Sequence, residues 1–209
     1  MTNVLTDEVS SSSHDHQGHV EGTGISNNKL LMWVFLGSEC LLFGGLISAY
    51  LVNRNRYHTG PAPGDIFDIP FTSVSSFVLL MSSLTMVLAL SALQRNDIRN
   101  NRIWLSTTAL LGALIIGGQV YEFTTFLREG LGYTTSPFSS AFFTLTGFHG
   151  VHVSLGIVML MSLLIASYRG TLRRENAETV EIVGLYWHFV DVVWIFIFTV
   201  IYLVPSPTA

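Results

Sequence analysis

Four side chains that can bind metals or exchange protons occur in two pairs with the same spacing. His149 and His152 are three residues apart in TLTGFHGVHVSLG, and His188 and Asp191 are three residues apart in GLYWHFVDVVW. Residues three apart project from the same face of an α-helix, so each pair can point toward a neighbouring helix. Imidazole and carboxylate groups arranged in this way either hold a transition metal or hydrogen-bond to one another.

A metal site is the less favoured interpretation of these pairs. The histidines lack the Glu-flanked spacing of zinc proteases, and the Glu-x-x-His pattern of diiron bundles does not accompany them. A hydrogen-bonded network satisfies buried donors and acceptors without an ion. We therefore expect no metal ligands, and we expect His188 and Asp191 to tie the last helix to the histidines of the preceding one. The predicted buried polar network consists of Glu122, His149, His152, Glu181, His188 and Asp191.

Glu39 lies apart from these pairs in an apolar stretch. The residues one helical turn away are all apolar, and the nearest basic residue, Lys29, is about three turns distant. An ionisable side chain at membrane depth is costly by at least about 2 to 3 kcal/mol, so it requires a partner or a role. Glu39 is therefore a donor to another helix, a proton-handling group or a contact with a partner subunit, and the first is favoured.

The chain that holds these residues has the composition of a membrane protein. Its 209 residues are 49% hydrophobic and 11% charged, against about 25% charged residues in soluble domains. Five apolar stretches are long enough to cross a hydrocarbon core of about 30 Å, which takes about 20 helical residues. We predict an all-α bundle of five transmembrane helices within residues 29–205, because helices satisfy their own backbone groups in lipid. The predicted spans are 30–52, 71–93, 103–126, 140–168 and 180–204.

Residues 1–28 are polar, rich in Ser and Gly, and lack the apolar core of a signal peptide. This composition predicts a disordered N-terminal tail. The tail contains His14, His16 and His19, which could bind a transition metal. A solvated tail without a metal site is the simpler interpretation.

The distribution of basic residues predicts the orientation of the helices. Cytoplasmic loops of membrane proteins hold the excess of Lys and Arg. On one side lie only Arg54, Arg56 and Arg128, so we expect the N-terminus to be cytoplasmic and the C-terminus to be outside. The basic residues of the predicted cytoplasmic side are Lys29, Arg95, Arg99, Arg102, Arg169, Arg173 and Arg174.

Four segments resemble, in chain order, the motifs of subunit III of the haem-copper respiratory oxidases. They are FLGSECLLFGG, QVYEF, SAFFTLTGFHGVHV and YWHFVDVVWIFIFTVIYLV, and the similarity extends from about residue 28 to residue 204. The resemblance implies a non-catalytic subunit of a proton-translocating oxidoreductase, with no catalytic residue and no cofactor in this chain. Haem and copper are then expected in the partner subunits, with subunit I as the main contact and subunit II as a second partner.

The same resemblance implies a multi-pass protein of a bacterial plasma membrane that acts in aerobic electron transport. Family members bind phospholipids and support assembly and sustained proton uptake into the subunit that reduces oxygen to water and pumps protons, so these roles are expected here. Glu39 matches the family's reactive buried glutamate in a Ser-Glu motif, a proton-related or lipid-facing carboxylate. The family's polar network is matched by Glu122, His149, His152, His188 and Asp191. No nucleic-acid partner is expected.

Two alternatives remain open. The segments TGFHG and GLYWHFVDVVW resemble cytochrome c oxidases, which we favour. The five-helix length, the His-rich tail and IFDIPF also resemble quinol oxidases. The second alternative is a stand-alone small transporter or proton channel. The chain shows neither the internal repeats nor the proline-broken helices that are typical of many secondary transporters.

Overall fold

A computed structural model describes residues 26–55 and 69–204, and these residues fold into five long helices without a strand among them. The helices are α1 (Asn27–Asn53), α3 (Ile69–Gln94), α4 (Ile98–Arg128), α5 (Pro137–Tyr168) and α6 (Ala177–Phe198). A 3₁₀ turn, η1 (Arg174–Asn176), precedes α6, and a π-helical turn, η2 (Thr199–Leu203), continues it. All five are long and apolar enough to cross a membrane, which confirms the predicted fold class. The predicted tail with its three histidines lies outside the described residues.

Polar side chains set the N-terminal ends of two helices. The Ser136 hydroxyl accepts a hydrogen bond from the backbone N–H of Ser139 at 3.1 Å, and the Ser139 hydroxyl accepts one from the N–H of Ser136 at 3.0 Å. This reciprocal cap, followed by Pro137, starts α5. At the start of α4, the Asp97 carboxylate accepts a hydrogen bond from the backbone N–H of Asn100 at 3.1 Å, a single cap without the reciprocal bond.

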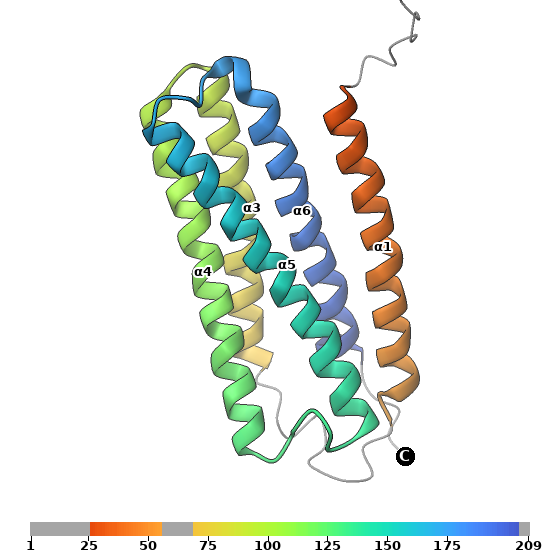
Figure 1. The fold of residues 1–209 in the computed structure, drawn as a ribbon. Helices are drawn as coiled ribbons and strands as arrows, with labels where there is room; N and C mark the ends of the chain where they lie inside the picture. Colours follow the sequence, from red (N-terminus) through yellow and green to blue (C-terminus); the bar gives the residue numbers. More distant parts are fainter. Residues whose placement is uncertain (1–25, 56–68, 205–209) are drawn as a thin grey trace, which may run out of the picture.

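Four of the helices form a bundle, and the fifth packs on its outside. Contacts join α3 to α4, α4 to α5, α5 to α6 and α6 back to α3, whereas the main contacts of α1 are with α5 and α6. Figure 1 shows the α3–α4 and α5–α6 turns at the same end of the molecule as the start of α1. The α4–α5 turn lies at the opposite end. Successive bundle helices therefore run antiparallel, as expected for helices that cross a bilayer in turn.

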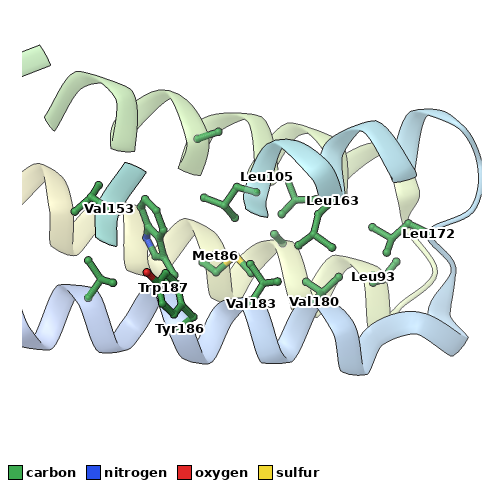
Figure 2. Close-up of a cluster of buried hydrophobic side chains, with 14 of the residues drawn as sticks. Met86, Leu93, Leu105, Val153, Leu163, Leu172, Val180, Val183, Tyr186 and Trp187 are labelled. Atoms are coloured by element: carbon green, nitrogen blue, oxygen red, sulfur yellow. The ribbon is translucent and has the colours of Figure 1, made fainter. Parts of the chain in front are cut away.

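Trp187 of α6 lies among the buried apolar side chains of the bundle core (Figure 2). Its side chain is 1% exposed, and its indole Nε1 donates a hydrogen bond to the Ser82 hydroxyl of α3 at 3.0 Å. A Cβ atom on Gly112 of α4 would come within 2.7 Å of the ring, and one on Gly156 of α5 within 2.8 Å. Trp187 thus contacts all three other bundle helices, and two of those contacts require a glycine.

Candidate functional site

The carboxyl group of Glu39 contacts the imidazole ring of His152 across the α1–α5 interface. Glu39 Oε2 lies 3.1 Å from His152 Nε2, and the two side chains are 14% and 11% exposed. The Phe43 ring also packs on the imidazole in a T-shaped arrangement, with 5.0 Å between ring centroids. The Tyr186 hydroxyl of α6 donates to the backbone carbonyl of His152 at 3.0 Å. The partner that Glu39 lacks in its own helix is therefore provided by α5.

The second ring nitrogen of His152 determines how protons are placed in this pair. His152 Nδ1 lies 2.8 Å from the carbonyl oxygen of Phe148, one turn earlier in α5. A carbonyl oxygen can only accept, so Nδ1 must carry a hydrogen. The hydrogen bond between Nε2 and the Glu39 carboxyl group then contains one proton, which belongs either to the carboxylic acid or to the imidazolium. The pair is electrically neutral overall in both arrangements, which suits its depth in the membrane.

Further polar contacts hold the two ends of α1, among them a hydrogen bond that the Ser26 hydroxyl donates to Glu178. Lys29 Nζ lies 2.9 Å from Glu181 Oε2 near the start of α6. At the other end of the helix, Arg54 Nη2 donates to the carbonyl oxygen of Val204 at 3.1 Å. With the contact at Glu39, α1 is held at both ends and in the middle. Glu181 therefore lies in a partly exposed ion pair near the end of the molecule, apart from the buried histidines.

His149 is buried against an aromatic ring. It is 1% exposed and stacks on Trp194 of α6, with 4.8 Å between ring centroids and an angle of 27° between the planes. Neither ring nitrogen of His149 has a hydrogen-bond partner within the described part of the chain. Trp194 Nε1 in turn donates to the Ser76 hydroxyl of α3 at 2.8 Å. His149 thus contributes to the α5–α6 interface through ring stacking.

His188 and Asp191 are turned toward α3. His188 Nδ1 lies 2.5 Å from the Ser83 hydroxyl, and the buried Asp191 carboxylate lies beside the same serine. Neither carboxylate oxygen makes a hydrogen bond to a described residue. The structure therefore has no hydrogen bond from His188 or Asp191 to the histidines of α5, which is the link that the spacing had led us to expect. The reason is that α6 packs against α3 as well as α5, and spacing along one helix does not say which neighbour a face meets.

Hydroxyl groups of α3 form several side-chain hydrogen bonds to the neighbouring helices α4 and α6, and the sequence patterns did not point to these residues. The sequence feature that could have identified them is the recurrence of Ser and Thr in TSVSSFVLLMSSLT, a segment that otherwise resembles an ordinary apolar helix. Thr72 donates to Glu122 Oε1 of α4 at 2.8 Å, which places Glu122 in an α3–α4 contact. Thr85 and Thr108 share a hydrogen bond at 2.8 Å. The α3 hydroxyl residues that bond to α4 or α6 are Thr72, Ser76, Ser82, Ser83 and Thr85.

The predicted network residues therefore form several separate contacts, and each joins two helices. Within residues 26–55 and 69–204, His, Cys, Asp and Glu side chains form no group of three or more that could hold a metal ion. The arrangement can bring helices together and can keep one proton between Glu39 and His152.

The family model and the relatives that this chain matches agree on one protein family. Residues 5–206 match the protein-family model for cytochrome c oxidase subunit III. The chain is 39% identical to cytochrome c oxidase subunit 3 of Bacillus sp. (strain PS3), over 95% of each chain. It is 40% identical to quinol oxidase subunit 3 of Bacillus subtilis (strain 168), over 84% of this chain and 86% of that one. It is 37% identical to cytochrome bo(3) ubiquinol oxidase subunit 3 of Pseudomonas aeruginosa, over 92% and 91% of the two chains.

Proposed function

The chain belongs to the cytochrome c oxidase subunit III family, and on this premise we propose that it is the accessory subunit of a terminal haem-copper oxidase that takes electrons from cytochrome c. It is a multi-pass protein of a bacterial plasma membrane. In the proposed complex, subunit I is the main contact, subunit II is a second partner, and haem, copper, oxygen reduction and proton pumping all lie in these partners. The N-terminus is cytoplasmic in this proposal.

The proposal rests on the contacts that the polar residues of the family motifs make between helices of this chain. Glu39 and His152 join α1 to α5, and His188 joins α6 to α3. These groups hold helices together inside the chain, while large apolar side chains such as Leu31, Leu41 and Val158 face outward. An apolar exterior of this kind suits a subunit that packs against lipid and other membrane subunits.

The same observation favours an accessory subunit over a stand-alone transporter or proton channel. A transporter needs polar groups that line a route near the midplane, commonly at broken helices. Here α1, α3, α4 and α5 are continuous, and the π-helical turn falls at the end of α6. The pairing of polar side chains between helices supports a structural role for them.

The electron donor is the finer part of the proposal. One of the relatives compared above is named as a cytochrome c oxidase subunit and two as quinol oxidase subunits, and their identities to this chain range from 37% to 40%. Overall identity therefore does not separate the donors. Cytochrome c is favoured on the segments TGFHG and GLYWHFVDVVW, and a quinol oxidase is the alternative.

We also propose that the subunit supports assembly, phospholipid binding and sustained proton uptake in the complex. The Glu39–His152 pair supports the last of these, because it keeps an exchangeable proton at membrane depth. The pair can pass its proton on only to a further proton acceptor, and it regains a proton only from a further donor. By itself the pair therefore holds a proton but does not form a proton pathway.

A tagged preparation tests the proposal. The chain, carrying a tag at its N-terminus, is extracted in mild detergent, and a reduced-minus-oxidised visible spectrum is recorded together with the masses of the co-purified subunits. Haem bands with a large co-purified subunit are expected, and haem c in a partner supports cytochrome c as the donor. A haem-free preparation from membranes that still contain intact oxidase would contradict the accessory role.

A further inference from the structure

Arg102 lines two hollows at the end of the bundle where the α3–α4 and α5–α6 turns lie. The larger has a volume of about 710 Å³ and is formed by the first turns of α4 and the last residue of α5. The smaller, of about 440 Å³, also contains Arg102, with Arg173, Arg174 and one carboxylate, Glu175. Side chains that line the larger hollow include Arg99, Arg102, Ile103, Ser106, Thr107 and Tyr168.

Arg102 is fixed in position before any ligand arrives. Its Nε donates to the Ser167 hydroxyl at 3.1 Å, and its Nη2 donates to the Ser167 carbonyl at the end of α5. The guanidinium carbon lies 4.8 Å from the centroid of the Tyr168 ring, a cation–π contact. The N–H groups of Nη1 have no partner within the described residues. A held guanidinium with free donors loses little side-chain entropy when it binds an anion.

The larger hollow has a net positive lining. Arg99 and Arg102 contribute two positive charges, and no Asp or Glu side chain lines this hollow. Arg99 is exposed and has no hydrogen bond or ion pair to any described residue. The Ser106 hydroxyl adds a neutral donor to the same wall. An anion with several acceptor oxygens, such as a phosphate diester, fits this set of donors.

The position of the hollow along α4 indicates where that anion comes from. The 31 residues of α4 correspond to a length of about 46 Å at 1.5 Å per residue. The hydrocarbon core is about 30 Å thick, so the two ends of α4 extend into the headgroup regions. Arg99 and Arg102 lie in its first two turns, at headgroup depth. Tyr168 and Ile103 are 65% and 50% exposed beside them, an aromatic and an aliphatic side chain of the kind that border the lipid interface.

We infer that this hollow binds the headgroup phosphate of an anionic glycerophospholipid through Arg99 and Arg102. The acyl chains run along the apolar surface of α4 that begins at Ile103. Basic pockets at the ends of membrane helices recognise anionic headgroups by this combination of fixed cations and adjacent apolar surface. The inference deepens the phospholipid-binding part of the proposed function and rests on it for the placement of the chain in a bilayer.

Lipid retention by matched arginine variants tests the inference. Wild type, Arg99→Gln and the control Arg128→Gln are purified with their co-purifying subunits and equilibrated in mixed micelles of phosphatidylglycerol and phosphatidylcholine. Arg128 is an exposed arginine at the opposite end of the same helix. Bound lipid per chain is then measured by mass spectrometry. We expect a several-fold loss of phosphatidylglycerol in Arg99→Gln, no loss in Arg128→Gln, and unchanged phosphatidylcholine in both.

Two results would overturn the inference. One is equal retention of phosphatidylglycerol by wild type and Arg99→Gln. The other is displacement of the bound phosphatidylglycerol by inorganic phosphate at comparable concentration, which would make the hollow a site for free phosphate. Haem content of the same samples separates this failure from a failure of the proposed function. Haem present with no lipid preference refutes only the lipid site, whereas absent haem in wild type refutes the oxidase role.

Discussion

His152 presents one ring nitrogen to the carboxyl group of Glu39, at 3.1 Å, and the other to the backbone of its own helix, at 2.8 Å from the Phe148 carbonyl. The backbone contact fixes the hydrogen on Nδ1, so the contact with Glu39 holds a single proton. This pair is the one side-chain hydrogen bond between α1 and α5 within the described residues. The pair therefore contributes to the docking of α1, and we propose that it also keeps a proton at membrane depth.

Substitutions at Glu39 separate these two roles. In Glu39→Gln the amide N–H can donate to His152 Nε2, so we expect α1 to remain docked, the haem spectrum to stay unchanged and sustained activity to fall modestly at most. In Glu39→Leu the imidazole nitrogen loses its partner, and we expect a loss of stability of about 1 kcal/mol. Thermal unfolding of the purified complex in detergent measures the difference. Equal stability of the two variants, or a missing haem band in Glu39→Gln, would contradict this assignment.

Gly156 has no room for a side chain. A Cβ atom there would lie 2.8 Å from two ring carbons of Trp187, and that ring is buried and held by Ser82. We expect Gly156→Ala to destabilise the fold by about 1 to 3 kcal/mol through overpacking. Gly147→Ala in the same helix is the control, because nothing lies within 4 Å of its Cβ position. Thermal unfolding of both variants tests this prediction, and equal stability would show that the core can move to accept the methyl group.

Ser83 and His188 should stabilise the fold through one shared hydrogen bond, so that the effects of substituting them are not additive. We expect Ser83→Ala and His188→Ala each to lower stability by about 1 kcal/mol, and the double variant to lose about as much as either single one. The reason is that removal of one partner already abolishes the bond between α3 and α6. A double-mutant cycle on thermal stability measures the coupling. Strictly additive losses would mean that the two side chains act independently.

Much of the fold could be predicted from the sequence because its determinants are long and redundant. Five apolar stretches predict five helices, and the family resemblance of the motifs is confirmed by the match over residues 5–206. The helix ends depend on single side chains and are harder to predict. For example, α4 begins at Ile98, five residues before its apolar stretch, because Asp97 caps the backbone of Asn100 and the polar turn that follows is helical.

The polar residues could be found from the sequence, but not their partners. His149 and His152 are on one face of α5, as their spacing indicates, yet one stacks on Trp194 of α6 and the other bonds to Glu39 of α1. A helix in a bundle contacts two or three neighbouring helices. The spacing of two residues shows that they share a face, but not which neighbouring helix that face contacts. Ser83 was missed for a related reason, because a serine in an apolar helix usually bonds to its own backbone.

We propose that the buried polar side chains of this chain hold its helices together, while oxygen reduction takes place in a partner subunit. The initial oxygen consumption per haem of complexes that contain Asp191→Asn tests it most directly. Asn has nearly the same shape as Asp, and Asp191 is 2% exposed in the α3–α6 interface. We expect any defect to appear in assembly or thermal stability, with initial turnover close to wild type. A group that transfers protons in the reaction contributes about 100-fold or more to the rate. A complex that assembles normally with intact haem spectra but loses turnover at once by that order would contradict the account.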